Sequence, residues 1–222
     1  MDIRPRIVCI AQNTFHQSET YLFEGIDGPA FAAVRHALFR DVPCLALAIV
    51  TILESSAEWP RDFIAHRIGQ IPVKGVDRMG VRTDGQGAVF EVHMAAPAEH
   101  DMPCAVTIVH STDFHLRRHG GGSAPQATLV HSCSVEECAI VGDQGLQVVA
   151  LLPGQKIHAR ATAWRGTGRQ HPRWICCQVA QLEYAPRRVL RVRTTGAVTA
   201  REALVAALRT TRERMLVLLA TM

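Results

Sequence analysis

Histidines and cysteines, which most often bind zinc in proteins, are concentrated in the middle of the chain. They are His93, His100, His110, His115, His119, His131, Cys104, Cys133 and Cys138. Their spacing does not match a zinc site, because no paired Cys-x2-Cys or His-Glu-x-x-His occurs. Cys176 and Cys177 are adjacent in an expected strand, so their side chains should point to opposite faces. Buried thiols and surface histidines explain the composition better, and we expect no metal and no cofactor.

Other catalytic patterns are also missing from the sequence. No Gly-x-Ser-x-Gly elbow occurs, and Glu136-Glu137 is the only adjacent acidic pair. The segment Arg-Gly-Thr-Gly-Arg-Gln-His, with Gly166 and Gly168, leads towards an expected strand and not into a helix that would bind phosphate. The sequence therefore predicts a protein without an active site of its own.

A basic segment, Arg187 to Arg193, offers one candidate for nucleic-acid contact. Arg191 and Arg193 should lie on the same side of a strand and face phosphates, although a solvated face or a surface for an acidic partner fits equally well. The net charge of +4 is too modest to decide. A stand-alone metal- or nucleic-acid-binding protein, using the His-rich middle and this face, is therefore the alternative function.

A histidine and an arginine stand side by side in the stretch Asp62 to Val73. Asp62 is a candidate cap for a short helix, on which Ile64 and Ile68 pack four residues apart. His66 and Arg67 lie off this apolar line. We interpret them as a docking segment for a neighbouring loop or subunit and not as a reactive pair.

The composition, 48% hydrophobic and 20% charged over 222 residues, is typical of a globular protein. The seven cysteines are odd in number and lie mostly in apolar runs, which favours reduced thiols. Neither a membrane span nor a signal peptide is expected. The predicted location is intracellular, in the nucleus for a eukaryotic or nuclear viral protein and otherwise in the cytoplasm.

A helix followed by a strand is predicted near the start of the chain. Asp27 or Gly28 caps the helix and Pro43 prevents its continuation. One face of the helix carries Phe31, Val34 and Leu38 at helical spacing. Cys44 to Leu53 is then expected to form a strand buried on both faces.

The segment from about residue 54 to residue 182 is predicted to be mainly β. Asp84-Gly85 and Pro153-Gly154 are expected hairpin turns, and His119 to Pro125 is an expected loop. One strand shows apolar residues at every second position, namely Ile157, Ala159, Ala161 and Ala163.

A long helix is predicted from the Thr-x-x-Glu capping box of Thr199 and Glu202 to the last residue. Its apolar seam, at intervals of three and four, comprises Leu204, Leu208, Thr211, Met215, Leu218 and Met222. Such a seam packs either on the protein's own sheet or on a helix of a second chain. Periodicity alone does not separate these two alternatives.

Three blocks of sequence together resemble the α-like subunits of DNA-directed RNA polymerases. This family comprises the eukaryotic third-largest subunits, their archaeal counterparts and, more distantly, bacterial α. The first block, Phe23 to Val73, is similar to the family's Asn-x-Leu-Arg-Arg helix, its following strand and its Ala-His-Arg-Leu-Gly-Leu-Ile-Pro segment. Leu151 to Trp174 resembles the Gly-Gln-Glu-Ile strand and the following loop. Thr194 to Met215 is similar to the closing helix.

The resemblance implies an α+β fold with a discontinuous RNA polymerase α-type dimerisation domain, residues 1–53 and 183–222, and an inserted mainly β domain, residues 54–182. It implies a non-catalytic transcription subunit that forms a heterodimer with a small α-like subunit. This dimer would dock the second-largest subunit and small zinc-containing subunits, and would meet DNA only indirectly. Whether the partner is a separate chain or a second copy stays open.

Candidate interface residues follow from helical periodicity and from motif position. The expected dimer interface comprises Phe31, Val34, Leu38, Leu204, Leu208, Met215 and Leu218. The expected contact with the large catalytic subunit comprises Arg35, His36, Phe39 and Arg40. His36 replaces the family's second arginine, and the family's zinc loop would fall at residues 76–89, which contain no cysteine. No zinc is therefore expected there.

Overall fold

The computed structural model describes residues 5–13, 17–75, 88–98, 106–116, 127–129, 145–183 and 187–221. The chain forms two compact units. One combines Met1–Cys44 with Gly166–Met222, and the other is Leu45–Arg165. Both units contain helices and sheets, so the expected α+β class is confirmed at this level. The predicted domain limits were residues 53 and 182. The units divide earlier, because strand β3 (Cys44–Ser55) joins the sheet of the second unit, whereas strand β11 (Cys177–Glu183) pairs with strand β12 (Arg188–Thr194) in the first.

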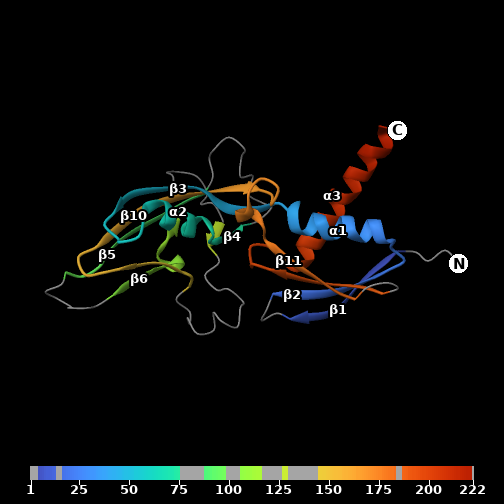
Figure 1. Cartoon of the computed structure of the whole chain (residues 1–222), viewed down its shortest axis with the longest axis horizontal. Coiled ribbons are helices and arrows are strands. Elements are labelled where there is room, and N and C mark those ends of the chain that lie inside the picture. Colours follow the sequence, from blue (N-terminus) through green and yellow to red (C-terminus); the bar gives the residue numbers. More distant parts are fainter. Residues whose placement is uncertain are drawn as a thin grey trace. The chain divides into compact units, whose positions relative to one another are not determined.

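The first unit is built on a four-stranded antiparallel sheet (Figure 1). In order across the sheet, its strands are β1 (Arg6–Asn13), β2 (Ser18–Glu24), β12 (Arg188–Thr194) and β11 (Cys177–Glu183). Leu190 pairs with Tyr21, and both are buried. Since residues paired across antiparallel strands share a face, Tyr21, Phe23, Leu190 and Val192 form one apolar face.

Two helices, α1 (Gly28–Arg40) and α3 (Ala200–Ala220), complete the core of this unit. The Asp27 side chain caps α1 by accepting a hydrogen bond from the Ala30 amide at 2.8 Å, as predicted. The capping box of Thr199 and Glu202 begins α3, also as predicted. Phe31 of α1 packs edge-to-face on Phe23 of the sheet at a ring distance of 5.1 Å.

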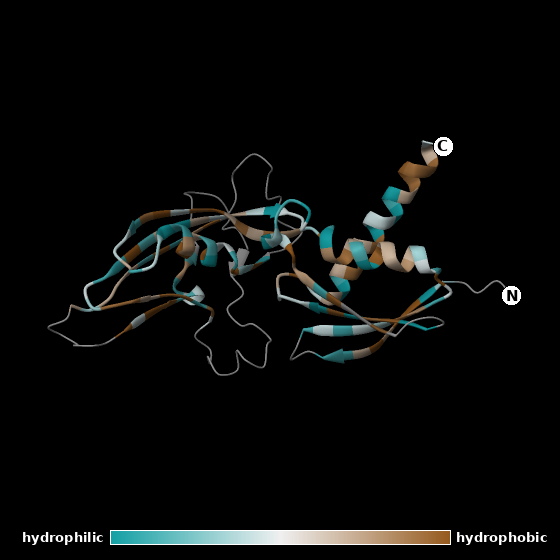
Figure 2. Cartoon of the chain, viewed as in Figure 1, coloured by the Kyte–Doolittle hydropathy of each residue, from teal (hydrophilic) through white to brown (hydrophobic). Residues whose placement is uncertain are grey.

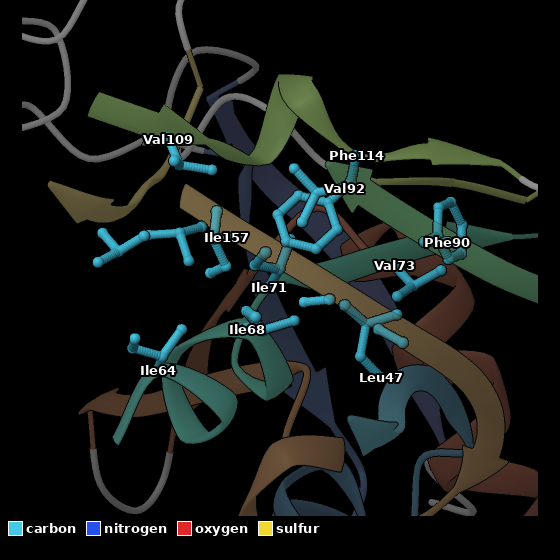
Figure 3. Close-up of a cluster of buried hydrophobic side chains, with 14 of the residues drawn as sticks. Leu47, Ile64, Ile68, Ile71, Val73, Phe90, Val92, Val109, Phe114 and Ile157 are labelled. Atoms are coloured by element: carbon cyan, nitrogen blue, oxygen red, sulfur yellow. The ribbon is translucent and has the colours of Figure 1, made fainter. Parts of the chain in front are cut away.

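The described part of the second unit contains a six-stranded sheet, a two-stranded sheet and one α-helix, α2 (Arg61–Gly69). The order of the larger sheet is β7 (His115–Leu116), β5 (Ala88–Ala95), β10 (Lys156–Gly166), β3 (Cys44–Ser55), β4 (Pro72–Gly75) and β8 (Ala127–Leu129). The smaller sheet pairs β6 (Thr107–His110) with β9 (Gln147–Leu151). Figure 3 shows their shared core, in which Ile64 and Ile68 of α2 lie beside Leu47, Val73 and Ile157.

The predicted helix of the Asp62–Val73 stretch is confirmed, with one correction. Ile64 and Ile68 are fully buried, as their spacing indicated. However, Asp62 is not the cap, because the helix begins one residue earlier, at Arg61, with Pro60 in the N-cap position. The Asp62 carboxylate instead lies in the first turn, where its negative charge interacts favourably with the positive end of the helix dipole.

The predictions for the strands are confirmed in part. The alternation from Ile157 to Ala163 in β10 is confirmed, since these four side chains are buried. Strand β3 is buried on both faces only from Cys44 to Leu47, and Ile49 is already half exposed. Pro153-Gly154 forms a turn, but not a hairpin, because β9 and β10 belong to different sheets. Asp84-Gly85 and His119 to Pro125 lie outside the described residues.

No helix in the described parts of the chain is long and apolar enough to cross a membrane.

The buried apolar line of α2 makes a quantitative prediction. Ile68→Ala removes a fully buried side chain, so we expect the free energy of unfolding to fall by about 2 to 5 kcal/mol. Phe63→Ala is the matched control on the same helix, because this side chain is 49% exposed, and it should cost less than about 1 kcal/mol. Urea denaturation followed by circular dichroism measures both. Equal losses would contradict the assignment of Ile68 to the core.

Candidate interaction site

The two faces of α1 differ in chemistry. Phe31, Val34, Ala37 and Leu38 are buried in the core of their own unit. Arg35, His36, Phe39 and Arg40 are all exposed. Because residues four apart on a helix are neighbours, Arg35 and Phe39 occupy adjacent positions on one face, as do His36 and Arg40. The structure thus brings together on one surface the four residues predicted to contact a large subunit.

The two halves of α3 differ in burial. Ala200, Ala203, Leu204 and Ala207 are buried in the first half, where small side chains permit close packing on the neighbouring elements. Leu208 is half-buried. Every described residue from Arg212 onward is exposed. The C-terminal turns of α3 project beyond α1 and the sheet of their unit (Figure 1).

The projecting end of α3 is apolar, as its colour in Figure 2 shows. The exposed fractions rise along it from 43% for Met215 to 69% for Leu219, with Leu216, Val217 and Leu218 between these values. Successive residues are turned by about 100° around a helix, so these side chains cover all its sides. A helix that is apolar all round is normally buried. The end of α3 therefore has the character of a contact surface for another molecule.

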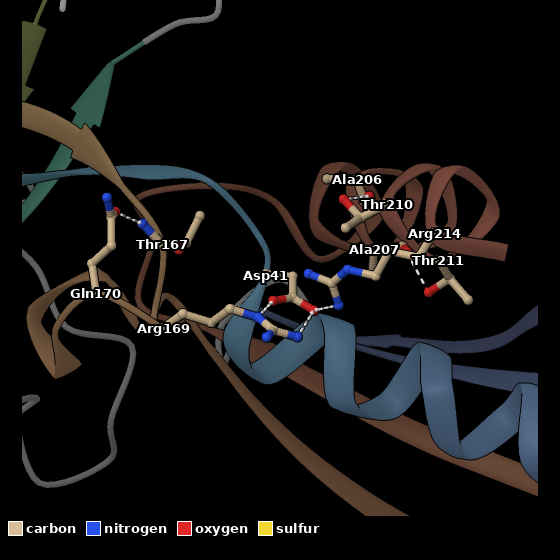
Figure 4. Close-up of polar contacts among 9 residues, drawn as sticks. All are labelled: Asp41, Thr167, Arg169, Gln170, Ala206, Ala207, Thr210, Thr211 and Arg214. Carbon is tan, nitrogen blue, oxygen red and sulfur yellow. Dashed lines mark hydrogen bonds and ion pairs between the residues drawn. The ribbon is translucent and has the colours of Figure 1, made fainter. Parts of the chain in front are cut away.

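The buried carboxylate of Asp41 joins α1 to α3 and to the loop that follows β10 (Figure 4). Asp41 is the C-cap of α1 and accepts hydrogen bonds from the guanidinium groups of Arg169 and Arg214. A second nitrogen of Arg169, Nη2, lies 3.3 Å from Oδ2. Burial raises the pKa of Asp41, but the hydrogen bonds and charges of Arg214 and Arg169 outweigh it and lower the pKa to about 2.

The loop that carries Arg169 approaches α1 closely at Gly168. A Cβ atom at this position would lie 3.0 Å from the Phe39 carbonyl oxygen and 3.0 Å from Cγ1 of Ile175. The Arg169 amide also donates to the Arg40 carbonyl oxygen at 3.1 Å. This loop, within the segment Arg-Gly-Thr-Gly-Arg-Gln-His, thus packs against the C-terminal end of α1. That end carries the negative pole of the helix dipole, which does not favour phosphate.

The residues predicted for a dimer interface fall into two groups. Phe31, Val34, Leu38 and Leu204 are buried within their own unit. Leu208 is half-buried, and Met215 and Leu218 are exposed. The first half of the seam thus packs on the protein itself, which is one of the two alternatives, whereas its second half packs on nothing in the described structure, so packing on a second chain stays a prediction for that half.

The predicted docking segment lies on the surface of α2. His66 is exposed, whereas Arg67 is half-buried and donates from Nη2 to the Gln147 carbonyl oxygen at 2.7 Å. The Arg67 guanidinium also lies 5.1 Å from the ring centre of Trp59. The neighbouring loop that Arg67 contacts is therefore part of its own unit, at the start of β9.

Three of the cysteines form a buried cluster. The Sγ atoms of Cys176 and Cys177 are 3.6 Å apart, and Cys44 donates from Sγ to the Trp174 carbonyl oxygen at 3.1 Å. The prediction that Cys176 and Cys177 point to opposite faces is therefore wrong, because β11 begins only at Cys177 and the backbone before it is irregular. The hydrogen bond with Cys176, together with burial, raises the pKa of Cys177.

The described residues contain no group of three or more histidine, cysteine, aspartate or glutamate side chains arranged to hold a metal ion. Of the histidines in the middle of the chain, His93 packs against His158 at a ring distance of 5.0 Å. His110 and His115 lie at the ends of short strands. His100, His119, His131, Cys104, Cys133, Cys138 and residues 76–87 lie outside the described part of the chain.

The basic segment before α3 lies on β12. Arg191 is exposed, Arg193 is half-buried, and both lie on the face opposite to Leu190 and Val192, as predicted. Arg188 points to the other face and donates from Nη1 to the Ile26 carbonyl oxygen at 2.6 Å. Only part of the arginine run is therefore available to a partner.

The Asp41 cluster was not found from the sequence, and it predicts acid sensitivity. A carboxyl whose pKa is lowered on folding stabilises the protein above its unfolded pKa, 3.8, and loses this effect as the pH falls towards 2. We expect Asp41→Asn to lower the free energy of unfolding at neutral pH by about 2 kcal/mol. The variant should also lose the fall in this free energy that the wild type shows between pH 3.8 and about 2. Urea denaturation at several pH values measures this. Asp62→Asn, at an exposed position, is the control. A variant with an unchanged acid profile would contradict the role of Asp41.

Comparison with known proteins gives the family context. No protein-family model matches the chain. The chain is 27% identical to subunit 3 of DNA-directed RNA polymerases II, IV and V from Arabidopsis thaliana, over 69% of this chain and 49% of that protein. It is 27% identical to DNA-directed RNA polymerase subunit Rpo3 from Methanocaldococcus jannaschii, over 78% of this chain and 73% of that protein. It is 22% identical to a conjugation stage-specific protein from Tetrahymena thermophila, over 73% of this chain and 55% of that protein.

These similarities extend across most of the chain and agree with the resemblance carried by its three sequence blocks. The chain spans about half the length of the Arabidopsis and Tetrahymena proteins. It is a divergent relative of the α-like third subunits of DNA-directed RNA polymerases.

Proposed function

We propose that this protein is a non-catalytic assembly subunit of a multisubunit DNA-directed RNA polymerase and pairs with a small α-like subunit. The observation that carries the proposal is the exposed apolar end of α3, in a chain related to polymerase third subunits. Burying one leucine side chain contributes about 1.5 to 3 kcal/mol. Covering Leu216, Leu218 and Leu219 would therefore give a partner a large part of its binding energy.

In this proposal, the unit formed by Met1–Cys44 and Gly166–Met222 acts as the α-type dimerisation domain, and Leu45–Arg165 is the insert. Leu208, Met215 and Leu218 contact the partner. Phe31, Val34, Leu38 and Leu204 lie in the core of the same unit, where they hold α1 and the first half of α3 in place and so position the exposed end of α3. The same arrangement is common at interfaces, where a rigid core holds a few exposed anchors.

The exposed face of α1 is the proposed contact with the second-largest, catalytic subunit. Arg35 and Arg40 provide charge and hydrogen-bond donors, Phe39 provides an apolar anchor, and His36 is a weaker donor between them. His66 and Arg67 on α2 are proposed to form a docking segment for a neighbouring subunit, with Arg67 positioned by its contact with Gln147. The protein would meet DNA only through the assembled, intracellular complex.

Affinity purification from the source organism tests the assignment directly. The expected co-purifying chains are a small α-like polymerase subunit and the second-largest subunit. Recovery of the protein without any polymerase chain, at native expression, would contradict the proposal.

Co-expression with the small α-like chain tests the interface. Met215→Asp/Leu218→Asp places two charges in the apolar surface, so we expect the affinity for that chain to fall at least about 30-fold, equivalent to about 2 kcal/mol. Val106→Asp is the matched control, because Val106 is also exposed but lies on the other unit. Binding by the double variant with unchanged affinity would exclude the end of α3 from the interface.

A second pair of substitutions separates the two proposed contacts. Arg35→Glu/Arg40→Glu reverses the charge of the exposed α1 face without touching α3. We expect the small α-like chain to remain bound and the second-largest subunit to be lost from the purified complex, because reversed charges at an interface are repulsive. Loss of both chains, or of neither, would contradict the separate role of α1.

A further inference from the structure

One side of α3 carries arginines within an exposed apolar stripe. Val205, Arg209, Arg212, Leu216 and Leu219 follow one another at intervals of four and three residues, which places them along one side of the helix. All five are exposed, and the three apolar members range from 39% for Val205 to 69% for Leu219. We call these five residues the mixed stripe. It is adjacent to, but different from, the buried line of Ala203, Leu204 and Ala207.

The arginines of the mixed stripe have no acidic partner among the described residues. Arg214, by contrast, is bound to Asp41 on the other side of the helix. Glu202 is engaged in the capping box, which leaves Glu213 as the one other acidic residue of α3. The exposed face of α1 adds Arg35 and Arg40 without an acidic residue in its helix. The helical surface of this unit is therefore cationic around its apolar parts.

This charge distribution limits which partner the stripe accepts. In a symmetric dimer the same patch meets itself, so a pairing centred on Arg209 and Arg212 would bring the arginines of the two copies together. Like charges at an interface cost free energy and select against that pairing. An apolar surface with unpaired arginines is instead complementary to an amphipathic helix that alternates apolar side chains with carboxylates.

We infer that the mixed stripe of α3 docks an acidic amphipathic helix of a different chain and that Arg209 and Arg212 disfavour pairing between two copies of this protein. The inference rests on the proposed function, in which α3 binds a partner, and it adds the chemistry of that partner. Nucleic acid fits less well, because phosphate contacts would leave Leu216 and Leu219 uncovered.

A charge-reversed copy of the full chain serves as a defined acidic partner. Arg209→Glu/Arg212→Glu keeps the apolar members of the mixed stripe and gives it the opposite sign. Labelled wild-type protein is titrated with wild type or with this variant, and fluorescence anisotropy and sedimentation velocity report association. We call wild type bound to the charge-reversed variant the mixed pair. We expect it to associate about tenfold more tightly than two wild-type copies at about 50 mM salt. The difference should shrink at about 500 mM salt, because salt screens attraction between exposed charges.

Two controls isolate the stripe. Arg187→Glu/Arg191→Glu makes the same change in net charge on and beside β12, and should not pair with wild type more tightly than wild type does. Leu216→Asp/Leu219→Asp in the charge-reversed copy should abolish the mixed pair, because the apolar members provide the affinity. Equal affinities for the wild-type and mixed pairs, or the same gain with the β12 control, would overturn the inference.

The outcomes also separate this inference from the proposed function. If polymerase chains co-purify equally with wild type and with Arg209→Glu/Arg212→Glu, the acidic-partner inference fails while the proposed function stands. If the charge effects hold but no polymerase chain co-purifies, the proposed function fails. If a labelled DNA duplex binds only when Arg209 and Arg212 are present, and the mixed pair does not form, the partner of the mixed stripe is nucleic acid and the inference is overturned.

Discussion

A single buried carboxylate, Asp41, connects the parts of the first unit on which its proposed interactions depend. It lies where α1 ends, and it receives Arg169 from a loop 128 residues further along the chain and Arg214 from α3. Asp41 is almost fully buried while both arginines are about half exposed. The cluster therefore avoids the full desolvation cost of a buried ion pair, since each guanidinium keeps part of its hydration. Its effect is to fix three backbone segments at one point.

The position of Arg214 gives this contact its importance. It is the last side chain of α3 with an ion pair in the described structure, and Met215 follows it directly. The N-terminal half of α3 is fixed by alanine packing, and Arg214 extends this fixation almost to the apolar end. An interaction surface whose direction is set before binding loses less conformational entropy when a partner arrives. The same cluster holds the end of α1, so both proposed surfaces share one support.

Local features of the fold were predictable from the sequence because each is determined by residues close together in the chain. The cap of α1 by Asp27, the capping box of α3 and the buried pair Ile64 and Ile68 all belong to this group. The Asp41 cluster was not predictable, because its members are far apart in sequence and an arginine run gives no sign of which member is paired. Periodicity also failed to distinguish Leu204 from Leu218, which occupy the same seam but differ in whether the core formed by the sheet and α1 reaches them.

That last difference explains how one helix can serve both folding and assembly. A helix of about 20 residues is about 30 Å long, and the sheet and α1 cover only its first half. The apolar side chains from Met215 to Leu219 add little to the stability of the isolated chain, because they stay exposed when it folds. The burial of these apolar side chains stabilises the protein only when a second molecule covers them. A partner that binds the folded chain would then raise its apparent stability in proportion to the logarithm of its concentration. Folding and assembly would thereby be coupled through the end of α3, while the buried half, held by Asp41 and the alanines, keeps the helix in place for that partner.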